Sequence, residues 1–302
     1  MKTSLRGKAL IASMRLMRRK QTFADVAKLH QSLAPRQRPD DAVPPSSARS
    51  GLEVEREEIL GRPVYTLRPP RALSSRHVLY LHGGAYVHQI QNDHWKFLGR
   101  LVRRTGCTVT APLYPLAPNH RYDQTIAMIL AAYKEKLGDI APADQIVMGD
   151  SAGGGLSLVL ARKLREQGRP QPKEIVLLSP WLDITMCDPK QREYDKHDPY
   201  LGIPGLLEAG RLYAGALDPS DPLVSPINGS LHGLGALTAF VGTRDVLLSD
   251  ARRLRTKADA EGVPLEYWEY PGMFHAWMIS TIPEARKATD RIVDLVTRQG
   301  RA

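Results

Sequence analysis

The sequence predicts an α/β protein with a mostly parallel central sheet flanked by helices, and two observations carry this prediction. From about residue 57 onward, short apolar runs alternate with helical segments, an order typical of a parallel sheet covered on both faces. The 302 residues are 42% hydrophobic and 25% charged, which suits a large core. The two cysteines, Cys107 and Cys187, cannot form a disulfide framework, and we expect both to be buried thiols.

Apolar runs and helical periodicity place the individual elements. We predict a strand or hairpin over 57–67, which turns at Gly61, and strands over 77–81, 108–113, 145–148, 174–178, 237–241 and 265–270. We predict helices over 5–20, 23–33, 94–105, 125–137, 152–167, 249–261 and 282–298. A Pro-, Ser- and Arg-rich stretch over 34–51 is typical of a linker. A Pro-, Gly- and Asp-rich insertion over about 181–234 is expected to lie over the C-terminal edge of the sheet.

Positive charge is concentrated at the N-terminus. The chain holds 42 Lys and Arg against 32 Asp and Glu, a net charge of +10, but residues 1–38 contain ten of the basic residues and a single acid, Asp25. The rest of the chain is nearly neutral, which argues against a nucleic-acid-binding protein. Arg15 interrupts the longest apolar-leaning run of this arm, so the arm does not fit a secretory signal. Because no segment approaches roughly 18 consecutive apolar residues, we expect no transmembrane helix and a cytoplasmic location.

Three interpretations of the basic arm are open. In the first, its helices pack as part of a cap and keep a charged outer face. In the second, the arm attaches peripherally to an anionic membrane through an apolar side made of Leu5, Leu10, Ile11, Met14 and Met17. In the third, the field of the arm attracts anionic substrates.

The segment Gly149-Asp150-Ser151-Ala152-Gly153 joins a predicted buried strand to a predicted helix. It fits the Gly-x-Ser-x-Gly pattern, in which a sharp turn holds the serine in a strained conformation at the top of a sheet. The flanking glycines avoid Cβ atoms that would collide with the adjacent strand and helix. The N-terminus of the following helix favours negative charge at the same place. The pattern predicts Ser151 as a nucleophile. The alternative is a nucleotide-binding turn, but this segment has neither the Gly-x-Gly-x-x-Gly spacing nor the Walker lysine of such turns.

A second glycine-rich segment, His82-Gly83-Gly84-Ala85, follows the predicted strand over 77–81. Backbone N–H groups in such a loop can approach a substrate closely and stabilise the negative charge of a tetrahedral intermediate. We expect Gly83, Gly84 and Ala85 to form an oxyanion hole with Ala152, the residue after the nucleophile. Gly84 and Ala85 are the main candidates in this loop, and His82 is expected to brace it.

An acid and a base follow in the order Ser, Asp, His, which completes a catalytic triad. Asp245 and His275 follow the last two predicted strands, so both lie at the sheet edge that carries Ser151. His275 would accept the Ser151 proton, and Asp245 would hold its tautomer and stabilise the imidazolium. Asp250, a rival acid, fits better as a helix cap or dipole partner. No spacing typical of a metal site appears, so we expect neither metal nor cofactor.

In combination, these motifs resemble the hormone-sensitive-lipase-like group of α/β-hydrolases over about residues 55–300. The matching residues are His82-Gly83-Gly84, Tyr114–Pro118, Gly149–Gly154, Leu178–Asp183, Ser225-Pro226, Gly242, Asp245 and His275. The resemblance implies an α/β-hydrolase fold and a cofactor-free carboxylesterase for short to medium acyl chains. It also implies a helical cap built from the N-terminal helices and the insertion after the sixth strand, here 1–50 and 181–225. We therefore expect an N-terminal basic helical cap segment with its linker (1–50) and a catalytic domain (51–302) whose cap insertion spans about 181–234.

Two departures from the family pattern stand out. Ala85 replaces the last glycine of the usual His-Gly-Gly-Gly loop. Its N–H donor is kept if φ of this residue is below zero, and its methyl group would narrow the pocket beside the acyl carbonyl. Pro115 and Asn119 stand where the family usually has Arg and Glu, which argues against a buried ion pair there.

These expectations converge on hydrolysis of small-molecule carboxylic esters through an acyl-enzyme. The same triad could cleave amides or formamides. A third hypothesis, a ligand-binding protein with a decayed triad, is disfavoured because Ser151, Asp245 and His275 are all present. No nucleic-acid partner is expected, and peripheral membrane contact and a homodimer stay open.

Overall fold

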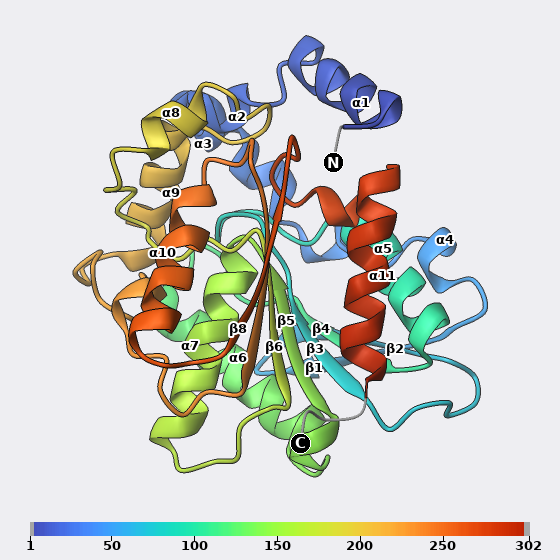
Figure 1. Ribbon diagram of the computed structural model, residues 1–302. Coiled ribbons are helices and arrows are strands. Elements are labelled where there is room, and N and C mark those ends of the chain that lie inside the picture. Colours follow the sequence, from blue (N-terminus) through green and yellow to red (C-terminus); the bar gives the residue numbers. More distant parts are fainter. Residues whose placement is uncertain (1–2, 299–302) are drawn as a thin grey trace.

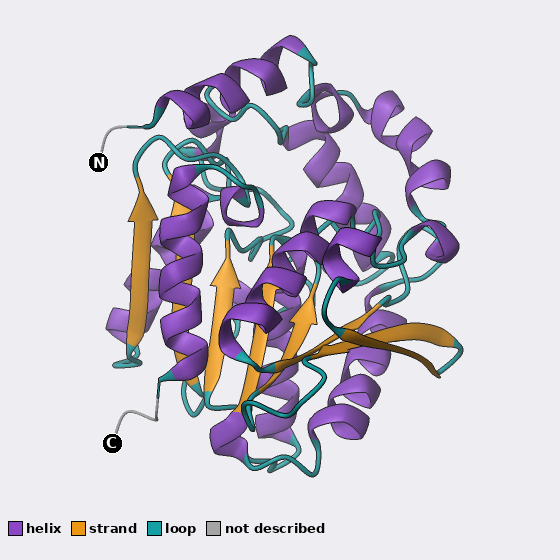
Figure 2. Ribbon diagram, turned by 90° about the vertical axis from the view of Figure 1, so that its right-hand side faces the viewer, coloured by secondary structure: helices purple, strands orange, loops and turns teal. Residues whose placement is uncertain are grey.

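The computed structural model describes residues 3–298 and confirms the predicted fold class. Met1 and Lys2 of the basic arm lie outside the described residues. The eight strands form one sheet in the order β1-β2-β4-β3-β5-β6-β7-β8. In this order, the six strands from β4 to β8 run parallel to one another. The strand β2 is antiparallel to both of its neighbours, β1 and β4. Helices cover both faces of the sheet (Figures 1 and 2).

The strand bounds follow the predicted apolar runs closely. They are β1 Glu53–Ile59, β2 Arg62–Arg68, β3 His77–Leu81, β4 Thr108–Pro112, β5 Gln145–Asp150, β6 Glu174–Leu178, β7 Ala236–Gly242 and β8 Leu265–Tyr270. The first predicted strand is the hairpin β1–β2, which turns at Gly61 and begins four residues earlier than predicted. Its first strand is rich in charged residues, so an apolar pattern does not mark its start.

The α-helices lie between the strands, at the N-terminus and in the insertion. They are α1 Leu5–Leu16, α2 Gln21–Ala24, α3 Val26–Arg36, α4 Ser46–Arg49, α5 Asn92–Thr105, α6 Tyr122–Leu137, α7 Ala152–Glu166, α8 Gln191–Asp195, α9 Ile203–Ala214, α10 Leu248–Ala260 and α11 Pro283–Thr297. Among the described residues, none of the helices combines the length and apolar character needed to cross a bilayer.

Two apolar layers flank the sheet because side chains alternate along each strand. In β3, Val78 and Tyr80 pack with α5 and α11, whereas Leu79 and Leu81 pack on the opposite face with α6 and α7. All of these strand side chains are fully buried. The carboxyl ends of the parallel strands therefore lie between two covered faces, at the end of the sheet where ligands bind in such folds.

The N-terminal helices differ from the prediction at their ends. α1 stops four residues early, where Arg18 adopts a left-handed φ of 51°. The second predicted helix is divided into α2 and α3 at Asp25, whose backbone is extended. The Asp25 carboxylate accepts hydrogen bonds from the N–H groups of Ala27 and Lys28 and so caps α3.

The two segments interpreted as a cap come together above the sheet. Figure 1 shows α2 and α3 beside α8 and α9, at the end of the sheet where the strand arrows point. Gly202 and Gly205 permit this packing, because a Cβ atom on either would lie within 2.7 Å of the backbone at Phe23 or Ala24. Beyond the end of α3, the predicted linker over 34–51 does not join these cap helices but packs beside the sheet. Its helix α4 contacts α5, and Trp95 donates a hydrogen bond to the Ala42 carbonyl at 3.0 Å.

The two cysteines lie in different environments. Cys107 is buried, as predicted, but Cys187 is exposed, so the expectation of a buried thiol was wrong for Cys187. The reason is its position in the irregular insertion, where Cys187 donates a weak hydrogen bond to Asp183 instead of packing into a core.

His77 provides a test of how this core responds to acid. Its ring is buried at the start of β3, within 2.8 Å of the Thr110 hydroxyl, and burial lowers its pKa to about 4. In the unfolded chain, the pKa of His77 is about 6.5. The neutral ring therefore makes its full contribution to the free energy of unfolding above that pH, and this contribution is lost as the pH falls toward 4. Relative to His77→Gln, the wild type is expected to lose about 2 kcal/mol of unfolding free energy between pH 7 and pH 5. Urea unfolding of both proteins at the two pH values measures this, and a constant difference would contradict it.

Candidate active site

Ser151 lies in a strained turn between β5 and α7. Its backbone adopts φ 53° and ψ −121°, a conformation that is costly for a residue with a side chain. The flanking glycines are required by close packing, because a Cβ atom on Gly149 would overlap the Gly153 carbonyl and one on Gly153 would overlap the Leu81 carbonyl. The local sequence therefore forms the turn expected of a nucleophile elbow.

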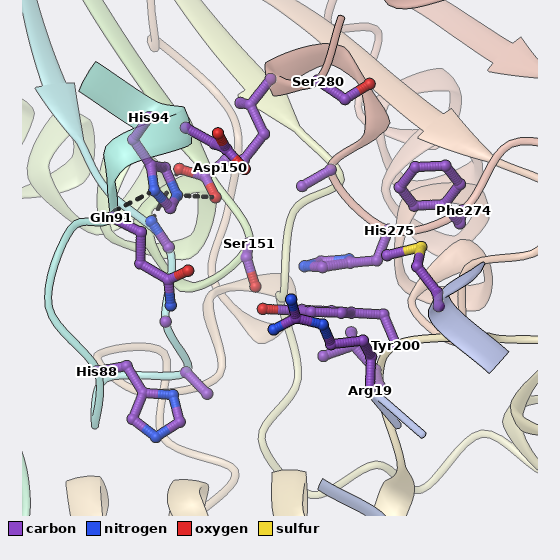
Figure 3. Close-up of a pocket in the computed structure, with 18 of the residues that line it drawn as sticks. Arg19, His88, Gln91, His94, Asp150, Ser151, Tyr200, Phe274, His275 and Ser280 are labelled. Atoms are coloured by element: carbon purple, nitrogen blue, oxygen red, sulfur yellow. Dashed lines mark hydrogen bonds and ion pairs between the residues drawn. The ribbon is translucent and has the colours of Figure 1, made fainter. Parts of the chain in front are cut away.

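Asp245 and His275 come together at the ends of β7 and β8. The Nδ1 atom of His275 lies 2.9 Å from Oδ2 of Asp245, and both side chains are buried. Burial acts to lower the pKa of His275, but the charge and hydrogen bond of Asp245 raise it above its ordinary value. Since Nδ1 donates to Asp245, Nε2 is left as the acceptor. Figure 3 shows the ring edge of His275 and the Ser151 hydroxyl pointing toward one another.

The predicted oxyanion residues lie beside Ser151, but their N–H groups differ in availability. Gly83 donates its N–H to Oδ1 of Asp150 at 2.8 Å, so it is already occupied. Ala152 is the first residue of α7, where N–H groups have no acceptor within the helix. Gly84 and Ala85 line the same pocket as Ser151. This arrangement leaves Gly84, Ala85 and Ala152 as candidate donors and gives Gly83 a structural bond instead.

The backbone of the glycine-rich loop is left-handed. Gly84 has φ 125° and Ala85 has φ 54°, so the condition set for Ala85, a φ below zero, is not met. Of the three candidate donors, Gly84 and Ala152 are therefore better supported than Ala85. The family motif places a glycine where this chain holds Ala85, and glycine adopts such angles without steric cost. The Ala85 side chain is buried on the pocket wall, where its methyl group takes up space.

A matched pair of substitutions tests this loop. A Cβ atom on Gly84 would overlap the His88 carbonyl, and φ 125° is unfavourable for alanine, so Gly84→Ala is expected to shift the loop and lower kcat about 100-fold or more. Ala85→Gly removes a methyl group at a position that glycine tolerates, so we expect kcat to be kept for small acyl groups and raised several-fold for branched ones. Steady-state kinetics with acetyl and pivaloyl p-nitrophenyl esters measure both effects. Equal kcat values for Gly84→Ala and wild type would contradict the assignment.

Asp150 ties the oxyanion loop to the nucleophile turn. Its buried carboxylate accepts hydrogen bonds from the Tyr80 hydroxyl at 2.6 Å and from the Gly83 N–H. Nδ1 of His94 accepts the Gln91 N–H, so Nε2 of His94 carries the hydrogen that bonds to Asp150 at 3.2 Å. Burial acts to raise the pKa of Asp150, but these partners lower it to about 2. The charged carboxylate therefore fixes the loop.

His82 braces the same loop, as predicted. Its ring stacks on Tyr114 with the centroids 4.2 Å apart, and the Tyr114 hydroxyl donates to the His82 carbonyl. Burial lowers the pKa of His82 to about 4, so the ring is neutral. A neutral ring whose Nδ1 donates to the Gly83 carbonyl is suited to support and not to proton transfer with the substrate.

Asp198 and Tyr200 are site residues that the sequence reasoning missed. The Tyr200 ring lies nearly parallel to that of His275, with the centroids 6.3 Å apart. Asp198 is buried and accepts N–H groups from Tyr200, Leu201 and Val246, which joins the insertion to the loop that carries Asp245. Burial and the charge of Asp245 raise the pKa of Asp198 to about 7. The only sequence signal was an Asp-Pro pair in an aperiodic segment.

The rival acid Asp250 is excluded from the triad by its contacts. It lies in the first turn of α10, as the dipole interpretation requires, but it does not cap the helix. Its buried carboxylate accepts the N–H groups of Leu182 and Asp183 and so anchors the start of the insertion.

A pocket of about 300 Å³ is lined by five of the predicted site residues and reaches the basic arm, whereas Asp245 and Ala152 lie behind its wall. Ser151 and His275 lie on its wall together with Gly83, Gly84 and Ala85. The other lining residues come from the arm, the α5 region, the insertion and the final loop: Leu10, Met14, Met17, Arg19, Phe23, His88, Gln89, Gln91, Asp93, His94, Asp150, Tyr200, Leu201, Phe274, Ala276, Ile279 and Ser280. Polar and apolar side chains contribute about equally to this wall, so the pocket can hold both the hydrocarbon part and the polar groups of a small molecule.

This fold and elbow define a class of hydrolases, and comparison with known proteins places the chain within it. Residues 78–279 match the family described as alpha/beta hydrolase fold, and the chain belongs to that family. An esterase of Acinetobacter venetianus is 34% identical over 235 residues, which cover 75% of this chain and 76% of that protein.

Comparison with solved structures shows which group of α/β-hydrolases this chain resembles. An esterase from the bacterial hormone-sensitive lipase family has a TM-score of 0.83 at 31% identity, and 99% of each chain is covered. EstE5, soaked by p-nitrophenyl butyrate, has a TM-score of 0.86 at 28% identity, covering 98% of this chain and 99% of its own. These likenesses confirm the predicted fold, the hormone-sensitive-lipase-like group and the class of enzyme, an esterase-type hydrolase.

Proposed function

We propose that this protein hydrolyses carboxylic esters of small molecules with short to medium acyl chains, through an acyl-enzyme on Ser151. The observation that carries the proposal is the buried His275–Asp245 pair at 2.9 Å, whose histidine lies on the wall of the pocket together with Ser151. The pocket volume of about 300 Å³ suits a small ester. Neither the volume nor the lining residues require a metal or a cofactor for this chemistry.

In the proposed mechanism, His275 Nε2 takes the proton of Ser151 as its Oγ attacks the ester carbonyl. Asp245 holds the imidazole tautomer and stabilises the imidazolium. The oxyanion accepts hydrogen bonds from the N–H groups of Ala152 and the Gly84–Ala85 loop. His275 then protonates the leaving alcohol, and a water molecule, activated by the same imidazole, releases the acid and restores Ser151.

We also propose that α1, α2 and α3 of the basic arm act with α8 and α9 as a cap over this pocket, in a cytoplasmic protein. Leu10, Met14 and Phe23 of the arm line the pocket wall, which supports this role. The helix α1 is further anchored at its start, where the Ser4 hydroxyl donates to Glu284 of α11 at 3.0 Å. The later part of the arm is left out of this proposed cap, because α4 packs against α5 and Ala42 accepts the hydrogen bond of Trp95 in α5.

Hydrolysis of p-nitrophenyl esters from acetyl to dodecanoyl tests the proposal. A rate that peaks at short or medium chains and requires Ser151 is expected. A peak at dodecanoyl would favour a lipid-surface enzyme instead. Absence of turnover with every ester in a folded protein, together with cleavage of p-nitroanilides, would replace the proposal with an amidase.

A further inference from the structure

Arg19 brings a positive charge from the N-terminal arm to the active-site pocket. It lies in the turn between α1 and α2 and lines the same pocket as Ser151 and His275. Figure 3 shows its guanidinium extending into the pocket by Tyr200. Burial raises the pKa of Tyr200, and the charges of Arg36 and Arg19 act against that rise, as expected for cations close to this ring.

The Arg19 guanidinium is not neutralised by the protein. Within residues 3–298, no carboxylate lies within 4.0 Å of it, whereas the adjacent Lys20 is paired with Asp195 at 3.1 Å. The two carboxylates on the pocket wall are already occupied. Asp150 is bonded within the oxyanion loop, and Asp93 is paired at the surface with Lys96 at 3.3 Å. The pocket therefore presents a cation without a counter-charge.

The free N–H donors of the Arg19 guanidinium, which form a planar fork, suit the oxygen atoms of an anion. An anionic group on a substrate would supply the counter-charge that the pocket wall lacks at this position.

We propose that the substrate is an ester that also carries an anionic oxygen group, a carboxylate or a phosphate, and that Arg19 binds this group. This inference rests on the proposed ester hydrolysis and assigns its substrate class. The apolar wall formed by Leu10, Met14 and Phe274 would hold the carbon chain between the anion and the scissile carbonyl. Arg19 thereby becomes a specificity-determining residue supplied by the basic arm.

Matched ester pairs test the proposal and locate the anion. For an anion on the acyl side, mono-p-nitrophenyl glutarate is compared with p-nitrophenyl pentanoate, and for one on the alcohol side, 4-acetoxybenzoate is compared with its methyl ester. The wild type is expected to prefer the anionic member of one pair, with a preference that falls as salt is added. Rates with Ser151→Ala supply the background of spontaneous hydrolysis.

Three variants then separate binding from structure. Arg19→Gln is expected to lower kcat/KM for the preferred anionic ester about tenfold and to change its neutral counterpart less than twofold. Arg19→Lys should restore part of the loss, and Arg15→Gln, which removes an exposed arginine of the same arm outside the pocket, should have no effect.

Two results would overturn the anion site: a wild type that prefers the neutral member of both pairs, or an Arg19→Gln variant that affects both members equally. Failure to hydrolyse any of the four esters would contradict the proposed function itself. These outcomes are distinguishable because the neutral esters report ester hydrolysis alone.

Discussion

Replacing Ser151 with alanine is expected to lower kcat for p-nitrophenyl butyrate by about 10⁴-fold or more while the protein stays folded. The side chain is small and buried, and its backbone strain is set by the turn, so loss of one oxygen atom removes the nucleophile without disturbing the fold. In comparable triad enzymes, loss of the nucleophilic serine costs up to about 10⁶-fold in kcat. Kinetics and a urea unfolding curve of the same preparation measure both parts of this prediction.

Ser249 provides the matched control for this substitution. It is a buried serine at the start of α10 whose hydroxyl has no hydrogen-bond partner among the described residues. Ser249→Ala should leave kcat unchanged and should not lower the unfolding free energy. If Ser151→Ala retained more than a tenth of the wild-type activity, Ser151 would not be the nucleophile.

Asp245→Asn is the second substitution with a large expected effect, a loss of about 10⁴-fold in kcat. An asparagine amide donates to the imidazole, so it favours the wrong tautomer of His275 and leaves the developing imidazolium without a counter-charge. The nearby carboxylates of Asp198 and Asp150 also act on His275 but do not hold its Nδ1 atom.

The pH dependence of this pair follows from the sign of the pKa shift. His275 acts as a base only when neutral, and its pKa is raised in the folded protein mainly by Asp245. Wild-type kcat/KM should therefore fall as the pH drops through a value above 6.5. In Asp245→Asn, the acid limb of the residual activity should move to lower pH, because the charge that raised the pKa is gone. An unchanged acid limb would show that another group controls it.

Local motifs allowed the sheet and the catalytic residues to be predicted from sequence. The strands β3, β5 and β6 are buried on both faces, so each appears as a continuous apolar run whose limits are visible. Gly149 and Gly153 are required by close backbone contacts, within the turn itself and with the end of the neighbouring strand β3, so the turn has a sequence signature. The fold and the family are accordingly confirmed, and the triad stays a prediction with a consistent geometry.

Residues that depend on tertiary contacts were not predictable in this way. Asp198 and Tyr200 lie in an aperiodic segment, and their proximity to His275 exists only because the insertion folds back over the sheet. Arg19 was one of ten basic residues in the arm, and only the structure distinguishes it by its place in the pocket. The division of the second helix at Asp25 depends on a capping bond that competes with helical periodicity.

The most direct test of the central claim is covalent titration of the nucleophile with a p-nitrophenyl phosphate triester, followed by mass analysis of the labelled peptide. The proposed mechanism predicts release of one equivalent of p-nitrophenol per chain, a dialkyl phosphate on Ser151 and loss of esterase activity in the same proportion. An enzyme that stays fully active after treatment, or a label on a residue other than Ser151, would contradict the mechanism.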